Sequence, residues 1–379
     1  MTADLRATKA TINLSAIAHN VGVFRERLHP GAAMMAVVKA NGYGHGAIPT
    51  ARAAIGAGAN WLGVAVAEEG RELRRAGIAV PVLVLGSSNP QQMELAIEED
   101  LDVTISDLSA WQSAVDCGER LGKKPRVHLK VDTGMGRLGV ASASVVTEWA
   151  PRLSDGRVVW QGLMSHLADS DGPEDETTRA QLSQFLDVIE SLRASEYTLP
   201  PILHLANSAA ALRYPGTHFG MVRIGIGLYG AVQYPGSPPL EPALSWETSV
   251  TLVKRVAQGT RIGYGGTFAA PSDCTIATLA IGYADGFRRS LSNRAEVLIH
   301  GHRCPVAGRV SMDQTTVMVP DGVAVQAGDR AILIGEDGGS AITVHEVAVW
   351  ADTIAYEILT GISDRVARRY LGNTSQEMA

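Results

Sequence analysis

The sequence predicts an α/β protein with an N-terminal (β/α)8 barrel and a C-terminal mostly β domain. In the first part of the chain, short apolar runs alternate with segments of helical apolar spacing, and eight such alternations favour a TIM-like barrel over a doubly wound sheet. After the Pro- and Gly-rich linker Tyr234–Pro242, apolar runs follow one another with turns between them. We assign residues 10–235 to the barrel and residues 236–379 to the β domain, with residues 1–9 as a candidate addition to the latter.

The barrel strands are predicted from short apolar runs, and the run Met34–Val38 is of the kind that forms a strand buried on both faces. Segments such as Asn89–Glu98 and Glu174–Ala194 have helical spacing and separate them. Asn89 before Pro90 is typical of an N-cap followed by proline at the first helical position. The predicted strands are Ala33–Lys39, Trp61–Val66, Val80–Gly86, Val103–Ser106, Arg126–Asp132, Val159–His166, Ile202–Ala206 and Val222–Tyr229.

The C-terminal domain is predicted to be a succession of strands with one helix near its end, roughly Val344–Ala351. At 379 residues, the chain is long enough for a barrel-sized domain and a second one. The predicted strands are Leu244–Val256, Thr275–Ile281, Ala295–Ile299, Thr315–Val319 and Ala331–Ile334.

Composition and charge exclude several classes of function. The net charge of −6 without a basic cluster argues against a nucleic-acid partner. No apolar run reaches the roughly 20 residues of a membrane span, and the charged segment Met1–Ala10 lacks the apolar core of a signal peptide. Cys117, Cys274 and Cys304 are odd in number and scattered, which suits reduced thiols. We expect a cytoplasmic protein that binds neither membranes nor nucleic acid.

The stretch Met34–Gly46, MMAVVKANGYGHG, places a lysine where a buried strand gives way to a glycine-rich turn. Removal of water from the Lys39 ammonium lowers its pKa, and a neutral amine can attack a carbonyl to form a Schiff base. A lysine that simply emerges from the sheet into water is the alternative. The residues at the ends of the other predicted strands distinguish a Schiff-base lysine from a solvated one.

Polar and basic residues also follow other predicted barrel strands. In a (β/α)8 barrel the chemistry lies at the carboxyl ends of the strands, often with a phosphate site after strands seven and eight. Any one of these residues could be a cap or a surface side chain, but together at one rim they indicate a site. They are Lys130, Asp132 and Arg137 after strand five, His166 at the end of strand six, Asn207 and Ser208 after strand seven, and Arg223, Gly225, Ile226 and Gly227 in strand eight.

Two glycine patterns and one His/Cys pattern are poor indicators of a nucleotide or metal site. Gly225-x-Gly227-x-x-Gly230 is followed by proline-rich coil instead of a helix. Gly134-x-Gly136-x-x-Gly139 precedes a helix-like segment, but its loop carries Arg137. His300-x-His302-x-Cys304 lies at a predicted hairpin, so we expect no metal there. Glycines near a phosphate remain useful because backbone N–H groups can approach it.

Several longer segments occur in one order along nearly the whole chain: ATINLSAIAHN, AVVKANGYGHG, HLKVDTGMGRLG, HLANSAA, MVRIGIGLYG, RIGYGGTF, IGYADGF, GRVSMDQTTV and AYEILTGISDRVARRY. In order and spacing they resemble the alanine racemase family. The resemblance implies pyridoxal 5′-phosphate (PLP) as cofactor, a barrel plus β-domain fold, and a homodimer with shared active sites. Gly42 departs from the family, which more often has alanine beside the tyrosine.

The resemblance also implies roles for individual residues. Lys39 matches the lysine that forms an aldimine with PLP, and Arg223 matches the arginine that faces the pyridine nitrogen. Arg137 matches a residue near the cofactor's phenolic oxygen and the substrate carboxylate. Lys130 matches a lysine that is carbamylated in many members and then supports Arg137. The residues that match the phosphate cradle are Tyr43, Ser208, Gly225, Ile226 and Tyr356.

A second group of matched residues concerns proton transfer. His166 and His204 match histidines that join Tyr264 and Arg223 through hydrogen bonds. Tyr264 comes from the β domain, and in this family such residues serve the partner subunit's site. Met312 as a substrate-binding residue, and Asp313 and Tyr283 as supporting residues, come from the same domain.

Racemisation fits this set of residues. The α-proton must leave one face of the amino acid and return on the other, and Lys39 and Tyr264 supply a base for each face. A phenol has an ordinary pKa near 10, so it needs support from neighbours to act as a base. An arginine does not readily protonate the pyridine nitrogen, which keeps the ring a weaker electron sink and suppresses transamination. The implied product is D-alanine, a peptidoglycan precursor, which the enzyme either supplies or consumes.

Four alternatives stay open. A serine or broad-specificity amino-acid racemase would use the same residues, although such members usually carry export signals. A PLP-dependent decarboxylase would not be expected to keep the RIGYGGTF tyrosine motif. A non-catalytic PLP-binding homeostasis protein is a single barrel, which the second domain argues against. A cofactor-free lysine aldolase would lack visible absorbance.

Overall fold

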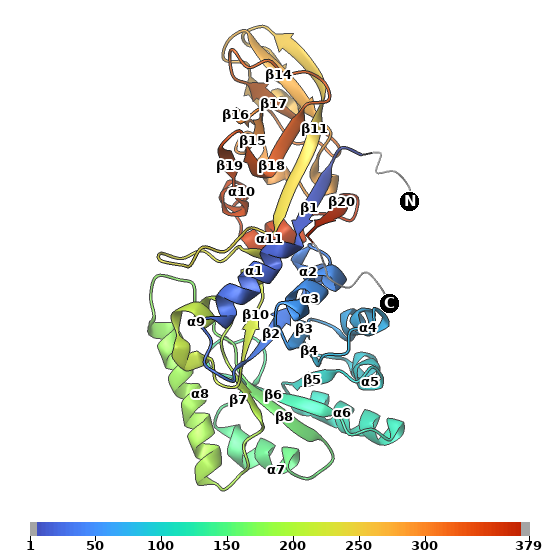
Figure 1. Cartoon of the computed structure of the whole chain (residues 1–379), viewed down its shortest axis with the longest axis vertical. Helices are drawn as coiled ribbons and strands as arrows, with labels where there is room; N and C mark the ends of the chain where they lie inside the picture. Colours follow the sequence, from blue (N-terminus) through green and yellow to red (C-terminus); the bar gives the residue numbers. More distant parts are fainter. Residues whose placement is uncertain (1–5, 373–379) are drawn as a thin grey trace. The chain divides into compact units, whose positions relative to one another are not determined.

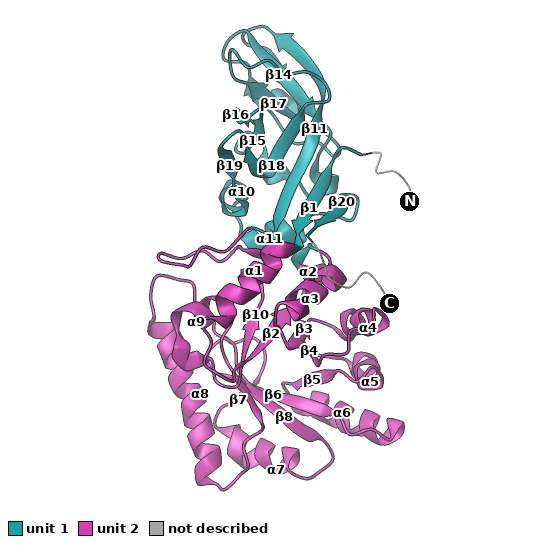
Figure 2. Cartoon of the chain, in the orientation of Figure 1, with its two compact units in different colours: residues 1–14, 43–45, 242–373 teal, residues 15–42, 46–241, 374–379 magenta. Residues whose placement is uncertain are grey.

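The computed structural model describes residues 6–372, which divide into two compact units (Figure 2). One unit comprises residues 15–42 and 46–241, and the other comprises residues 6–14, 43–45 and 242–372. Residues 373–379, predicted as part of the β domain, and residues 1–5, a candidate addition to it, lie outside the described residues. Among the helices of residues 6–372, none is long and apolar enough to cross a membrane.

The first unit is a barrel of eight parallel strands, as predicted. Their order around the sheet is β10-β2-β3-β4-β5-β6-β8-β9. Backbone hydrogen bonds from Gly220 to Leu203 (3.0 Å) and from Arg223 to Ala206 (3.0 Å) join the segments at the two ends of this order. The strands are β2 (Ala33–Val37), β3 (Trp61–Val64), β4 (Val82–Val84), β5 (Asp102–Ile105), β6 (Arg126–Asp132), β8 (Val159–Met164), β9 (Ile202–His204) and β10 (Met221–Ile224).

Met34–Val38 is buried at every position, which confirms the prediction for this run, and strands β3, β4, β5 and β10 are buried along their whole length as well. Helices separate the strands along the chain (Figure 1). Asn89 caps α5, because its side chain accepts a hydrogen bond from the Gln92 N–H. The helical segments of the barrel are α1 (Leu14–Arg25), α3 (Ala47–Gly56), α4 (Ala67–Arg75), α5 (Pro90–Glu98), α6 (Leu108–Leu121), η1 (Val145–Trp149), α7 (Ala150–Leu153), α8 (Glu176–Ala194), α9 (Ser208–Arg213), η2 (Pro215–Thr217) and η3 (Ile226–Tyr229).

The second unit is mostly β, also as predicted. Its largest sheet has the order β16-β15-β18-β11-β1-β20, with β14 and β17 attached through β11 and β19 through β18. The N-terminal strand β1 pairs antiparallel with β11 and parallel with β20. The strands are β1 (Lys9–Asn13), β11 (Leu244–Val256), β12 (Arg261–Ile262), β13 (Phe268–Ala269), β14 (Cys274–Leu279), β15 (Glu296–Ile299), β16 (His302–Pro305), β17 (Thr315–Val319), β18 (Arg330–Asp337), β19 (Ser340–Ile342) and β20 (Ala367–Leu371).

The predicted helix α10 (Val344–Ala351) is present, and Thr343 caps it by accepting from the Glu346 N–H. A second helix, α11 (Ala355–Thr360), follows it and was not predicted. Asp352, which has a left-handed backbone conformation, ends α10, and only a short connection leads from it to α11. The apolar pattern of this segment therefore does not show by itself where one helix ends and the next begins.

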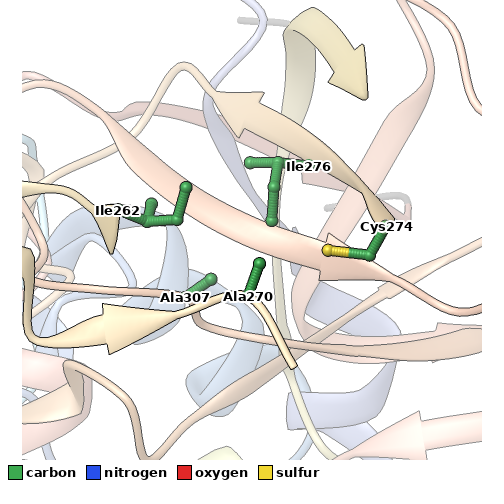
Figure 3. Close-up of a cluster of buried hydrophobic side chains, with 5 residues drawn as sticks. All are labelled: Ile262, Ala270, Cys274, Ile276 and Ala307. Atoms are coloured by element: carbon green, nitrogen blue, oxygen red, sulfur yellow. The ribbon is translucent and has the colours of Figure 1, made fainter. Parts of the chain in front are cut away.

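A small apolar cluster supports one end of the second unit (Figure 3). Ile262 of β12 packs there with Cys274 and Ile276 of β14 and with Ala270 and Ala307, all at most 5% exposed. Ile262 lies two residues before Tyr264, so this cluster fixes the strand from which the Tyr264 turn departs.

Candidate active site

The residues predicted for the barrel rim lie at the carboxyl ends of the strands. Lys39 comes two residues after β2, which ends at Val37 and therefore sooner than predicted. Lys130 is in the last half of β6, and His166 comes two residues after β8. Arg223 is in β10, which pairs in parallel with β2. The fold thus gathers the predicted basic residues at one end of the barrel.

The chain after Lys39 forms a left-handed turn. Ala40, Asn41, Gly42 and Tyr43 have φ values of 51°, 51°, 61° and 51°. Consecutive left-handed residues other than glycine are costly, by about 1 kcal/mol each. Such strain persists where surrounding contacts enforce it, and it is common at functional sites.

Glu69 holds this turn in place. Its Oε1 accepts a hydrogen bond from the Ala40 N–H (2.6 Å), and its Oε2 accepts one from the Ala65 N–H (2.7 Å). Burial lowers the pKa of Lys39, the nearby Arg137 lowers it further, and Glu69 opposes the shift. Glu69 was not among the predicted residues, because an acidic residue in the first turn of a helix is explained equally well by the helix dipole.

Lys130 is buried near other basic groups. Burial lowers its pKa to about 8, with further contributions from Arg223 and Arg137. Asp132 opposes this shift, but its own carboxylate is engaged by the loop that follows: Oδ1 accepts from the N–H groups of residues 134, 135 and 136 at 2.9, 2.9 and 3.1 Å. The backbone of this loop therefore wraps an internal carboxylate. The two-residue strand β7 (Val140–Ala141) follows the loop, and the predicted helical segment comes after it as η1 and α7.

Arg223 is only 4% exposed and donates hydrogen bonds to four acceptors. The two hydrogens of its Nη2 are shared among three acceptors, the carbonyl oxygens of Ser165 (2.8 Å) and Leu205 (3.0 Å) and His166 Nδ1 (3.1 Å). Its Nη1 donates to His204 Nδ1 at 3.2 Å. Burial lowers the pKa of Arg223 to about 10. Burial, followed by the charge of Arg223, holds the pKa of both histidines well below its ordinary value.

Ser208, the first residue of α9, connects two of the predicted cradle segments. Its Oγ accepts hydrogen bonds from the N–H groups of Gly225 (2.9 Å) and Gly227 (3.2 Å). A Cβ at Gly227 would lie 2.5 Å from the Phe24 ring and 3.2 Å from Ser208 Cβ, so this position requires glycine. The buried Ile226 begins the η3 turn beside them.

Tyr43 and Tyr356, also predicted for the cradle, lie together in the second unit with ring centroids 6.0 Å apart. Burial, then the neighbouring Tyr356, raises the pKa of Tyr43 above its ordinary value, which favours an intact hydroxyl donor. A Cβ at Gly44 would lie 2.3 Å from the Leu359 carbonyl oxygen, so glycine allows this segment to approach α11 closely.

The remaining predicted residues lie on neighbouring loops of the second unit. The segment Gly308–Asp313 runs between the Tyr264 turn and the Tyr283 turn: a Cβ at Gly263 would lie 3.2 Å from the Arg309 nitrogen, and the Tyr283 N–H donates to the Ser311 carbonyl (3.0 Å). The side chains of Tyr264 and Met312 are 71% and 53% exposed, and Asp313 accepts from Arg365 at 2.8 Å.

The basic rim of the barrel fits an anionic ligand. The charges of Arg137 and Arg223 lower the pKa of Lys130, and the charge of Arg137 also lowers the pKa of Lys39, so these four basic side chains lie near one another. Their facing carboxylates, Glu69 and Asp132, are both occupied by backbone N–H groups. This excess of positive charge suits a phosphate or a carboxylate.

The part of the chain that the structure describes offers no comparable site for a metal ion. Within residues 6–372, no group of three or more His, Cys, Asp or Glu side chains is arranged to hold one. His300 lies in the turn of the predicted hairpin between β15 and β16, His302 begins β16, and His300 Nε2 pairs with Asp329 Oδ2 at 2.8 Å.

Comparisons with known proteins agree over nearly the whole chain. The family model for the alanine racemase N-terminal domain matches residues 12–233, and that for the C-terminal domain matches residues 243–370. An alanine racemase of Symbiobacterium thermophilum is 48% identical over 374 residues, covering 98% of this chain and 99% of the relative.

Solved structures give the same result. The alanine racemase of a D-cycloserine-producing Streptomyces lavendulae superposes with a TM-score of 0.90 at 39% identity, covering 97% of this chain and 98% of that one. The Bacillus anthracis alanine racemase with bound L-Ala-P gives a TM-score of 0.91 at 38% identity, covering 98% and 96%. With these likenesses, the fold and the site define an isomerase of the racemase type. The chain belongs to the alanine racemase family.

Proposed function

We propose that the protein interconverts L-alanine and D-alanine with PLP as cofactor. The observation that carries the proposal is Lys39, a lysine with a lowered pKa on a strained turn at the carboxyl end of a barrel with an anion-binding rim. Relatives named alanine racemase, one of them solved with L-Ala-P, support alanine as the substrate. When bound, PLP withdraws electrons from the substrate and so makes its α-proton acidic.

The barrel residues fit this cofactor. Lys39 would link to its aldehyde, because burial and Arg137 favour the neutral amine that the linkage requires. Arg223 would face the pyridine nitrogen. Ser208, Gly225 and Ile226 would hold the phosphate, and the Gly225 N–H would then exchange its hydrogen bond to Ser208 Oγ for one to the phosphate. By the family resemblance, Tyr43 and Tyr356 of the second unit would add two hydroxyl groups to this phosphate site.

Proton transfer needs one base on each face of the substrate, and we assign Tyr264 to L-alanine and Lys39 to D-alanine. The hydrogen bonds at Arg223 support this. A guanidinium can only donate, so His166 accepts at Nδ1 and carries its own proton on Nε2. His166 would therefore present a donor to the Tyr264 oxygen and stabilise its phenolate.

Arg137 and Met312 would bind the substrate, with Arg137 paired to its carboxylate. Lys130 would support Arg137 as a carbamate, because a lysine beside an arginine is otherwise a like-charge pair. The pKa of about 8 for Lys130 leaves part of its amine neutral near neutral pH, which is the form that reacts with CO2.

The active site would be shared in a homodimer, with Tyr264, Tyr283, Met312 and Asp313 serving the partner's barrel. The exposure of Tyr264 (71%) supports this, because a large aromatic side chain on a proposed catalytic loop is unusually open in a single chain. A two-fold pair would complete both sites at once.

The direct test is an assay of purified protein with the L- and D-isomers of alanine, serine and lysine, after its visible absorbance has been recorded. We expect PLP-type absorbance and the highest kcat/KM for alanine. Comparable values for serine or lysine would favour a broad-specificity racemase. Absorbance without turnover of any isomer would favour a PLP-binding protein without catalysis.

The assignment of bases is tested by α-proton exchange in deuterated water. Tyr264→Phe should still exchange the α-proton of D-alanine, while exchange of L-alanine collapses. Equal loss for both isomers would contradict face-specific bases.

A further inference from the structure

A buried chain of polar side chains continues from Arg223 away from the predicted catalytic residues. His204 accepts from Arg223 at Nδ1, and its Nε2 lies 2.9 Å from His128 Nδ1. His128 Nε2 lies 3.3 Å from Asp102 Oδ2. Asp102, His128 and His204 are each 0% exposed. Neither Asp102 nor His128 has a role in the function proposed above.

The barrel makes room for this chain at Gly162. His128 on β6 pairs in register with Gly162 on β8, and β8 lies between β6 and β9, which carries His204. A Cβ at Gly162 would lie 2.1 Å from His128 Nδ1. The two imidazole rings meet edge to face, with centroids 5.0 Å apart at 90°. A missing side chain on the intervening strand therefore lets the two histidines meet.

The chemistry of the donors gives the chain a single direction. A guanidinium has no acceptor and a carboxylate has no donor, so the two ends fix what lies between. His204 accepts from Arg223 at Nδ1 and, as a neutral ring, carries its proton on Nε2. That proton is donated to His128 Nδ1, and His128 Nε2–H is donated to Asp102. Reversing either ring would set two N–H groups against each other.

We propose that Asp102 and His128 are positioning residues, which hold His204 in the tautomer that accepts from Arg223 and so fix the guanidinium. The proposal rests on the proposed function, in which Arg223 faces the pyridine nitrogen. If His204 carried its proton on Nδ1, it would repel the Arg223 Nη1–H, and the guanidinium would have to move. A carboxylate buried on the far side of the barrel thereby controls the geometry of the site.

The tautomers are directly observable by neutron diffraction from holoenzyme crystals exchanged into D2O. We expect deuterium on Nε2 of both His128 and His204 and none on Nδ1 of either. Deuterium on His204 Nδ1 would overturn the proposal. This measurement uses the wild-type protein, so it decides the question even where a variant does not fold.

The kinetics of Asp102→Asn test whether the tautomer of His204 affects catalysis through Arg223. Arg126 Nε donates to Asp102 Oδ1 at 2.7 Å, so an amide that keeps this bond turns its NH2 group towards His128 and reverses the chain. We expect kcat for alanine to fall by roughly ten- to a hundred-fold. This is the size of effect seen when a residue that hydrogen-bonds to a metal-binding histidine, and so orients its ring, is replaced. KM should stay within about two-fold, because none of these groups touches the substrate.

Arg126→Gln is the matched control. It removes the same ion pair but keeps the carboxylate that His128 needs, so kcat should stay within about two-fold of the wild type. An unchanged kcat in Asp102→Asn, or an equal loss in Arg126→Gln, would refute the positioning role. A failure of the proposed function would be recognised by a different result. In that case Lys39→Ala would retain wild-type racemisation, independently of the result for Asp102→Asn.

Discussion

At the scale of single residues, the site brings basic groups together that repel one another. Lys39 and Lys130 both have a lowered pKa, in each case first because of burial and then because of neighbouring arginines. Glu69 and Asp132 offset this only in part, because backbone N–H groups occupy their oxygens. The protein alone is thus less stable at this rim than with an anion bound, since any ligand that binds only the folded state stabilises it.

Lys130 should make stability depend on pH. Its folded pKa of about 8 lies below the ordinary 10.5, so between these values the unfolded chain binds more protons and the free energy of unfolding rises with pH. In CO2-free buffer, wild type should gain up to about 3 kcal/mol relative to Lys130→Gln across this window. Urea unfolding of both proteins at a series of pH values measures the difference.

Bicarbonate provides the control for this prediction. A carbamylated Lys130 no longer titrates as an amine, so added bicarbonate should flatten the difference between the two proteins. Parallel stability curves for wild type and Lys130→Gln in CO2-free buffer would show that the lysine is not buried as described.

Gly162 should not tolerate a larger residue. In Gly162→Ala the new methyl group would lie 2.1 Å from His128 Nδ1, and crowding of this kind costs about 1–3 kcal/mol or more. Gly22→Ala is a suitable control, because α1 leaves open space at that position and alanine favours a helix. Denaturant unfolding should show a loss for the first variant and no loss for the second.

The sequence predicted which residues lie at the rim but not the buried chain behind it. Lys39, Lys130 and Arg223 were found because they follow or end apolar runs at a known end of the barrel. Asp102 directly precedes the predicted strand Val103–Ser106, and His128 lies inside the predicted strand Arg126–Asp132, and no motif marks either residue. The signal that could have found them is a titratable side chain in or next to a barrel strand, since an acidic residue is rarely buried there without a partner.

At the scale of elements, all eight barrel strands were predicted, with ends that differ by a few residues. The left-handed turn after β2 was not, because Ala40 and Asn41 have no intrinsic need for positive φ and only tertiary contacts impose it. Strand β1 was missed because Lys9–Asn13 is short, and its partners β11 and β20 lie far along the sequence.

The left-handed turn after β2 predicts opposite effects of two substitutions on the free energy of unfolding. Ala40→Gly should raise the free energy of unfolding by about 1 kcal/mol, because glycine adopts φ 51° without steric cost. Gly42→Ala should lower it by about the same amount, since φ is 61° and the new Cβ would meet the Ala47 nitrogen at 3.2 Å. Urea unfolding of the pair tests this. Changes of equal sign would mean that the left-handed turn is not the native conformation.

At the scale of the whole molecule, the shared site can be tested by subunit exchange. Lys39→Ala and Tyr264→Phe homodimers should each be nearly inactive. A mixed dimer has one site with both lesions and one with an intact Lys39 and an intact partner Tyr264. Random pairing makes half of the dimers mixed, so about one quarter of wild-type activity should return. No recovery after verified exchange would show that both residues of a site come from one chain.

The interleaving of the two units has a consequence for how this gene can recombine. β1 precedes the barrel yet pairs with β11 and β20, and residues 43–45 belong with the same unit. A single crossover at residue 241 between two homologous genes would therefore put strands from different parents into one sheet. An intact β unit is inherited only if residues 6–14 and 43–45 travel with the C-terminal half, so the two units evolve as linked parts and not as exchangeable modules.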